Sequence, residues 1–261
     1  MRAQELFDLI EAHAPLRFQE DFDNAGIQVG DTQREVTGVL LCTDVSPAVI
    51  DEAVASRCNV IISHHPLIFH GLKKLVGGTP VQRMVAKAIK HDLVIYCAHT
   101  NMDNVPQGVS FKMAQKLGMT EVEILDAHAT EGWPAVGSGV IGRVEPMTAR
   151  ALLERVKATF EVGAVRCSGD LDRQVERVAL CGGAGGFLID KAVAAGAELF
   201  ISADLRYHDF LDHNDRIVLA DIGHYESEHF TKEIFYDIIQ KKNPTFAVSF
   251  SKQEKNQIIY L

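Results

Sequence analysis

The sequence lacks any uninterrupted apolar run of the length that a membrane-spanning helix requires. Its first residues, Met1 to Glu5, lead into an amphipathic segment without the hydrophobic region of a signal peptide. We therefore expect a cytoplasmic protein without membrane contact. With 47% hydrophobic and 23% charged residues, the 261-residue chain has a globular composition and can form one large or two medium domains.

Cysteine is scarce and has no paired motif. The chain has five cysteines and no C-x-x-C pair, and an odd number in a cytosolic chain indicates reduced thiols. Cys42, Cys97 and Cys181 lie at the ends of apolar runs, where core packing is the predicted role. No local pattern supports a catalytic cysteine.

Basic residues are outnumbered by acidic ones. The chain has 26 Lys and Arg against 35 Asp and Glu, a formal net charge of −9. This balance argues against nucleic acid as a partner, because such binding needs a basic surface. Bound cations could offset part of the negative charge.

The first half alternates continuous apolar runs with amphipathic segments. Ser46 and Pro47 are typical of a helix start, and Thr79 is a plausible cap for a later helix. Continuous apolar strands indicate a sheet covered on both faces, so the fold class predicted is α/β. The elements expected here are a helix near residues 6–10, strands at 38–43, 59–63 and 93–98, and helices at 47–56, 80–91 and 108–117.

The stretch Asp126 to Gly139 contains glycine and proline, which are typical of loops, and we expect it to separate this half from a second α/β half. We expect an N-terminal half at 1–126 and a C-terminal half at 127–261, which could intertwine, with a metal site in the cleft between them. The elements expected in the second half are strands at 138–144, 163–167, 175–181, 199–202 and 217–221, helices at 148–160, 187–195 and 225–240, and a closing hairpin at 245–250 and 257–260.

The run Ile61 to Pro66 ends an apolar strand in two adjacent histidines, His64 and His65. Neutral imidazoles are good ligands for borderline divalent metals. Neighbouring side chains point to opposite faces of a strand, but Pro66 stops the pairing. The two rings could therefore converge where the strand opens into a loop, or serve two metals.

Two further segments place polar side chains just past an apolar strand. The first contains His99 and Asp103, and the second contains His224 and Glu228. In open α/β sheets, ligands collect beyond the carboxyl ends of the strands. The i, i+4 spacing of the second pair puts both side chains on one helix face.

Three histidines and two carboxylates make up the predicted ligand set. A carboxylate has two oxygens and can bridge two cations, so the set suits two Zn, Mn, Fe or Co ions about 3.5–4 Å apart. The predicted metal ligands are His64, His65, Asp103, His224 and Glu228.

Other polar residues have open roles. His99 and His208 are candidates for proton shuttles or for partners of the ligands. Asp44 could orient a ligand or cap the following turn. The glycine run Gly182–Gly186 matches no P-loop, and a tight turn with close packing is about as plausible as anion binding.

These segments resemble the NIF3 family, whose bacterial members are often labelled GTP cyclohydrolase 1 type 2 homologues. The match spans nearly the whole chain. The segments that carry the resemblance are Asp23-Asn24-Ala25-Gly26-Ile27-Gln28-Val29-Gly30, Ser63-His64-His65-Pro66-Leu67-Ile68-Phe69, Ala98-His99-Thr100-Asn101-Met102-Asp103, the Cys181–Gly186 loop and Asp221-Ile222-Gly223-His224-Tyr225-Glu226-Ser227-Glu228.

The resemblance implies that the same five residues bind a dinuclear metal centre. It also implies a toroidal homohexamer, and the chain looks like the short form without the central insert domain of longer relatives. One departure is Ala203 before Asp204, where relatives usually have glycine.

Two functions are compatible with this sequence. The first is a dinuclear metal-dependent hydrolase of a nucleotide-like or other small substrate, and the family label suggests GTP. The alternative is a metal-binding ring that acts as a regulator or scaffold without catalysis. Five protein ligands for two ions leave open coordination positions, which favours the enzyme.

Overall fold

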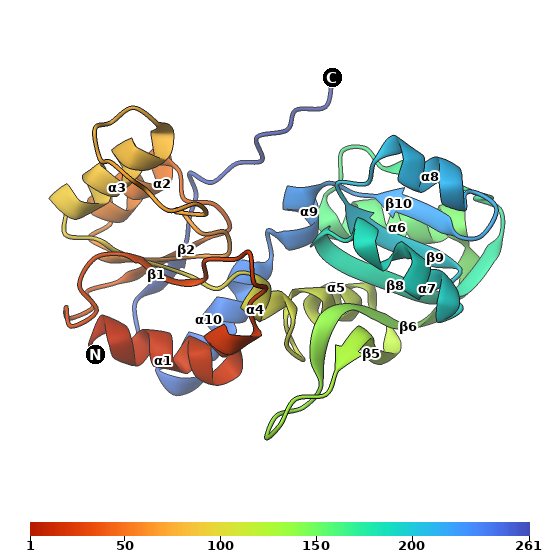
Figure 1. The fold of residues 1–261 in the computed structure, drawn as a ribbon, viewed down its shortest axis with the longest axis horizontal. Coiled ribbons are helices and arrows are strands. Elements are labelled where there is room, and N and C mark those ends of the chain that lie inside the picture. Colours follow the sequence, from red (N-terminus) through yellow and green to blue (C-terminus); the bar gives the residue numbers. More distant parts are fainter. The chain divides into compact units, whose positions relative to one another are not determined.

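A computed structural model describes all residues 1–261 and shows a mixed α/β protein with two sheets, which confirms the predicted fold class. The chain forms two compact units (Figure 1). Unit 1 comprises Met1–Met102 and Phe230–Lys255, and unit 2 comprises Asp103–His229 and Asn256–Leu261. None of the helices is both long enough and apolar enough to cross a membrane.

Unit 1 contains a five-stranded sheet in the order β1-β4-β3-β2-β11. The three central strands are apolar runs buried on both faces, and they pair in parallel, as their continuous hydrophobicity predicts. The edge strand β1 runs antiparallel to β4. The strands are β1 (Gly26–Val29), β2 (Val39–Cys42), β3 (Val60–Ser63), β4 (Val94–Cys97) and β11 (Val248–Phe250).

Helices cover both faces of this sheet, with α2 and α3 on one side and α1 and α10 on the other (Figure 1). Ser46 Oγ accepts a hydrogen bond from the backbone N–H of Val49, and Pro47 occupies the first turn, so the predicted start of α2 is confirmed. Thr79 caps α3 in the same way. The helices are α1 (Ala3–His13), η1 (Leu16–Phe18), α2 (Pro47–Ala55), α3 (Pro80–Lys90) and α10 (Thr231–Lys242), and α4 (Thr100–Asp103) ends at the first residue of unit 2.

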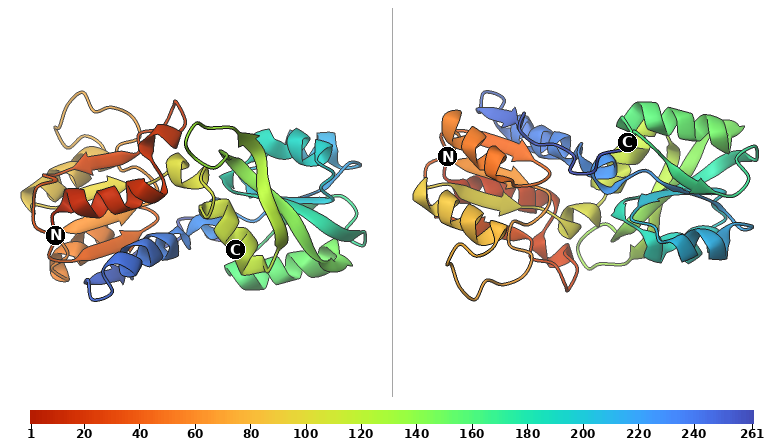
Figure 2. Two further views of the ribbon diagram at one scale, coloured as in Figure 1. Left: turned by 90° about the horizontal axis from the view of Figure 1, so that it is seen from below. Right: turned by 90° about the horizontal axis from the view of Figure 1, so that it is seen from above.

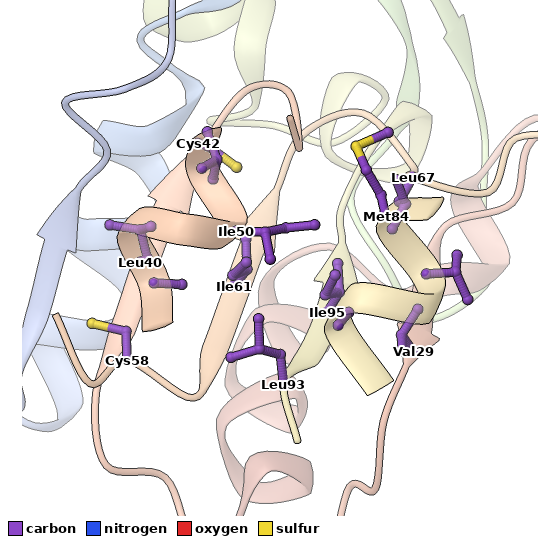
Figure 3. Packing of buried hydrophobic residues seen from close by; sticks show 14 residues of the cluster. Val29, Leu40, Cys42, Ile50, Cys58, Ile61, Leu67, Met84, Leu93 and Ile95 are labelled. Atoms are coloured by element: carbon purple, nitrogen blue, oxygen red, sulfur yellow. The ribbon is translucent and has the colours of Figure 1, made fainter. Parts of the chain in front are cut away.

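The core of unit 1 lies between the sheet and the α2/α3 layer (Figure 3). Leu40, Ile61 and Ile95 project from neighbouring strands toward Ile50 of α2 and Met84 of α3. Burial of such side chains stabilises a fold by about 1.5–3 kcal/mol each.

Unit 2 contains a six-stranded sheet in the order β5-β6-β8-β9-β10-β7. Strands β8, β9 and β10 are parallel, and the outer pairs are antiparallel. Helix α6 lies on one face of the sheet and helices α7 and α8 on the other (Figure 2). The strands are β5 (Thr120–His128), β6 (Val136–Thr148), β7 (Arg166–Ser168), β8 (Gln174–Ala184), β9 (Leu199–Ala203) and β10 (Val218–Asp221), and the helices are α5 (Val109–Leu117), α6 (Ala149–Phe160), η2 (Gly186–Leu188), α7 (Ile189–Ala194), α8 (Tyr207–His213) and α9 (His224–Glu228).

The predicted separator at 126–139 lies within one antiparallel hairpin of unit 2. Asp126 in β5 pairs with Ser138 in β6, so the glycines and proline mark a hairpin tip and not a linker. The two units therefore differ from the predicted halves 1–126 and 127–261. Unit 2 begins at Asp103, and the chain returns to unit 1 at Phe230.

The C-terminal region also differs from the sequence prediction. The expected helix at 225–240 is two helices, α9 and α10, and the break coincides with the passage of the chain from unit 2 to unit 1. The expected hairpin is absent, because β11 pairs in parallel with β2. Residues 257–260 form no strand, and the N–H of Ile258 bonds instead to the side chain of Asn256.

Candidate metal centre

Three histidines gather where β3 and β4 of unit 1 end. The parallel register pairs Ser63 with Cys97, so His64, His65 and His99 all follow at the same edge of the sheet. Their ring centroids lie 5.0–5.4 Å apart. One ligand atom from each ring lies within 4.8 Å of the others, which makes the trio a group that could hold a metal ion.

The two adjacent rings converge because regular strand geometry stops at Ser63. The N–H of His64 bonds to Cys42 O, and the N–H of His65 bonds to Thr43 O, both at the end of β2. In a regular strand, neighbouring N–H groups point in opposite directions. The doublet therefore leaves the strand in a turn that brings both rings together.

Each ring of this trio is held at Nδ1 by an oxygen. The acceptors are Ala98 O for His64 at 2.9 Å, Asp44 Oδ1 for His65 at 2.9 Å and Asp23 Oδ1 for His99 at 2.7 Å. Carbonyl and carboxylate oxygens only accept, so Nδ1 carries a proton, and in the neutral ring Nε2 holds the lone pair. This arrangement orients histidine ligands in metal sites.

Asp23 is a carboxylate bound on several sides. Its Oδ2 accepts hydrogen bonds from the backbone N–H of Thr100 at 3.0 Å and from Thr100 Oγ1 at 2.5 Å. Burial raises the pKa of Asp23, but the hydrogen bonds from His99 and Thr100 outweigh burial and lower this pKa to about 2. Asp23 is therefore charged at neutral pH and fixes the loop that carries His99.

Unit 2 carries a second group of candidate ligands, Asp103, His224 and Glu228, in which Glu228 lies close to each of the other two. Helix α9 contains His224 at its first position and Glu228 one turn later, as the i, i+4 spacing predicts. Nδ1 of His224 lies 2.7 Å from Asp204 Oδ2, and its Nε2 lies 3.1 Å from Glu228 Oε2. Carboxylate oxygens of Asp103 and Glu228 lie within 4.8 Å of each other.

The chemistry of this second group fits a divalent cation. Asp204 accepts a hydrogen bond from Nδ1 of His224, and Nε2 of the same ring faces the carboxylate of Glu228 at 3.1 Å, so either a proton on Nε2 or a cation must lie between the two atoms. Glu228 is only 3% exposed, so its charge is poorly solvated. The nearby carboxylate of Asp103 adds to the need for a positive charge.

Asp221 ties together the loops that carry this group. Its Oδ2 accepts from the backbone N–H of Leu205, beside Asp204, and its Oδ1 accepts from the N–H of Gly223, beside His224. Arg166 Nη1 balances the charge of this carboxylate at 3.0 Å. Asp221 thus holds His224 and its partner in register.

The glycine run packs closely against α9. The carboxylate of Glu228 fills the space that a Cβ on Gly183 would need, and Gly183 has a φ of +63°. Backbone N–H groups of the run donate to serine hydroxyls instead of pointing into open space. These pairs are Gly182 with Ser110, Gly183 with Ser227 and Gly185 with Ser202.

Cys181 lies beside this group as a protonated thiol. Burial raises its pKa, and the negative charges of Asp103 and Glu228 raise it further. Without a bound cation, Cys181 is therefore a protonated thiol and not a thiolate. All five cysteines are free, and only Cys167 is exposed.

The sequence does not predict two of the acids that hold the histidines, and it predicts a role near the ligands for one histidine that the structure places outside the ligand groups. The two missed acids are Asp23 and Asp204, and of the two roles that the sequence allows for Asp44 the structure shows orientation of His65. The signal in the sequence that could have found these acids is their position close to the ends of strands. His208, at the start of α8, is exposed, contacts the ring of Tyr207 and belongs to none of the groups that could hold a metal.

Comparison with known proteins gives one consistent family. The model of the family described as Duf34/NIF3 (NGG1p interacting factor 3) matches residues 1–257. A Clostridium acetobutylicum protein named GTP cyclohydrolase 1 type 2 homolog is 34% identical over 233 residues, which are 87% of this chain and 85% of that protein. A Lactococcus lactis protein of the same name is 30% identical over 256 residues, or 96% of this chain and 95% of that protein.

Solved structures agree with these matches. The crystal structure of a Staphylococcus aureus hypothetical protein has a TM-score of 0.91 at 28% identity and covers 100% of this chain and 99% of its own. A Bacillus cereus protein related to NIF3 has a TM-score of 0.90 at 24% identity, with the same coverage, which shows a shared fold.

Proposed function

The chain belongs to the Duf34/NIF3 family, and from this membership and its ligand groups we propose a dinuclear metal-dependent hydrolase of a nucleotide-like substrate. The metal ligands in this proposal are His64, His65, Asp103, His224 and Glu228. The observation that carries it is that the buried carboxylate of Glu228 lies beside both Asp103 and Nε2 of His224, 3.1 Å away, while Nδ1 of that ring is bound by Asp204.

We further propose that the ligand groups of the two units serve one centre. The chain itself supports this proposal, because His99 and Asp103 are only four residues apart and α4 spans the interval. Four residues of helix rise about 6 Å. A second passage between the units, from His229 to Phe230, comes one residue after Glu228.

Divalent ions at such a centre lower the pKa of bound water and stabilise negative charge that develops on a substrate. The protein's part is to present oriented lone pairs, which the Nδ1 hydrogen bonds of His64, His65 and His224 provide. His99 has the same tautomer but stands outside the proposed ligand set. Its Nε2 is suited to accept a proton from water or substrate and to return it to a leaving group.

The name shared by these relatives, GTP cyclohydrolase 1 type 2 homolog, supports a nucleotide as the substrate to test first. GTP has a base that can be opened by hydrolysis and phosphates that can bind divalent ions. A hexameric ring and a cytoplasmic location stay predictions, and sedimentation velocity of the purified protein tests the ring.

The test combines metal analysis with a substrate screen. Purified protein should contain about two divalent ions per chain and turn over GTP, another nucleotide or a phosphoester. The variants His64→Ala and His224→Ala each remove one proposed ligand, and His91→Ala removes an exposed histidine at the end of α3 as a control. Metal content and turnover should fall in the first two variants and stay unchanged in the third.

The alternatives give different results. Metal retained at full stoichiometry without turnover of any substrate would favour a regulator or scaffold. A protein that neither contains nor takes up metal would contradict the central proposal.

A further inference from the structure

Two exposed phenylalanine rings meet beside the histidine trio of unit 1. Phe22 is 66% exposed and Phe69 is 39% exposed, and their ring centroids lie 6.4 Å apart with a tilt of 49°. Phe69 also meets the ring of His99 edge-on at 6.3 Å. The aromatic surface is therefore continuous from Phe22 to the histidines.

Hydrogen bonds fix the two segments that carry these rings. Asn24 Nδ2 donates to Ile68 O at 2.5 Å, and the N–H of Ile68 donates to Gln28 Oε1 at 3.0 Å. Phe22 precedes Asn24 by two residues, and Phe69 directly follows Ile68. The loop after β3 is thus tied to the segment before β1, and the two rings are held close to each other.

Core packing does not account for this pair. Neither ring belongs to the buried cluster of unit 1, whose nearest members along the chain are Val29 and Leu67. Aromatic rings left partly in water have a free energy cost that binding of an apolar or planar ligand recovers. A planar ligand ring can stack on the face of one phenylalanine while its edge contacts the ring of the other phenylalanine. Stacked and edge-to-face contacts are the arrangements that aromatic pairs prefer.

We propose that Phe22 and Phe69 form a stacking platform for the planar heteroaromatic ring of the substrate, such as a purine base. The platform places that ring next to His99, and it deepens the proposed hydrolase function, on which it rests. It recognises the base through its flat face, so it selects for a heteroaromatic group and not for the phosphates.

The test compares binding of GTP with binding of inorganic triphosphate by metal-loaded protein, using titration calorimetry. Phe22→Leu and Phe69→Leu keep an apolar side chain but remove the aromatic face. The matched control is Phe250→Leu, because Phe250 is 41% exposed and meets another ring of unit 1, that of Tyr236. Each platform variant should weaken GTP binding about tenfold, as loss of base stacking does. Triphosphate affinity should stay the same, and the control should match the unmodified protein.

Each other outcome has a defined meaning. Equal GTP affinity in the platform variants and the control would overturn the platform, as would the absence of binding by GTP, ATP and guanosine to metal-loaded protein. Metal content, measured on every variant, reports on the metal centre independently. Base binding that needs both phenylalanines, without any turnover, would uphold the platform and contradict the hydrolase.

Discussion

Oδ1 of Asp44 lies 2.9 Å from Nδ1 of His65, and this contact sets which nitrogen of the ring offers a lone pair. Asp44→Ala removes the acceptor, so the imidazole can rotate or adopt the other tautomer. We expect metal affinity to fall about 10–100-fold, measured by competition with a chelator. Asp51→Ala is the control, because Asp51 pairs only with Lys87 among the ion pairs described. Equal affinities in the two variants would contradict an orienting role for Asp44.

Gly183 is expected to be intolerant of a methyl group. Both Gly183 and Gly196 have positive φ angles, +63° and +77°, but only at Gly183 would a Cβ collide with Glu228. Gly196→Ala should lose about 1–2 kcal/mol from backbone strain. Gly183→Ala should lose more and should also bind metal more weakly. Urea denaturation of the two variants measures the loss of stability, and metal titration reports on displacement of the Glu228 carboxylate. Similar metal affinities in the two variants would argue against displacement.

His99 should behave as a proton carrier and not as a ligand. His99→Gln keeps a polar side chain but removes the group that exchanges protons. If a substrate is found, turnover should fall about 10²–10⁴-fold while metal content stays unchanged. Metal analysis by mass spectrometry, together with turnover measurements, distinguishes a proton carrier from a ligand. Loss of an ion in His99→Gln would instead make His99 part of the ligand set.

Glu52 should make the stability of the protein dependent on pH. Burial raises the pKa of Glu52, but hydrogen bonds from Ser251 Oγ and the backbone N–H groups of Lys252 and Gln253 outweigh it, so the pKa is lowered. A lowered pKa in the folded state gives stability that is complete above the ordinary glutamate pKa of about 4.3 and is lost as the pH falls below it.

The variant Glu52→Gln isolates this contribution. At neutral pH it should be less stable than the unmodified protein by up to about 1 kcal/mol, because the carboxylate is largely solvated. The difference should shrink toward zero as the pH falls below the ordinary glutamate pKa. Urea denaturation at neutral pH and at a pH below the ordinary glutamate pKa measures this difference in stability. A difference that stays constant with pH would show that the charge of Glu52 does not contribute to stability.

The parallel strands β2, β3, β4, β9 and β10 were predictable because each is a short apolar run buried on both faces. Val60–Ser63 is an example, and the ligands could be located from the rule that polar groups follow such strands. Strand β5 was not predicted, because its sequence carries several charges and pairs as an antiparallel edge. The antiparallel edge strand β1 was missed as well, since its four residues have no continuous apolar pattern.

The partners of the histidines could not be inferred from spacing. Asp23 and His99 are 76 residues apart, and Asp204 and His224 are 20 apart, so only the fold brings each pair within 2.7 Å. Local patterns specify which residues can bind a metal. Long-range packing specifies the tautomer and direction in which they do so.

Strand β11 completes the sheet of unit 1 with residues from the far end of the chain. During synthesis on the ribosome, one edge of β2 therefore stays unpaired until Val248–Phe250 emerges. By then the residues of unit 2 up to His229 have already been made. The unit that begins first therefore gains its last strand only after nearly all of unit 2 has been made. An unpaired edge of this kind invites pairing with other chains, so the nascent protein is most prone to aggregation before its last strand is added.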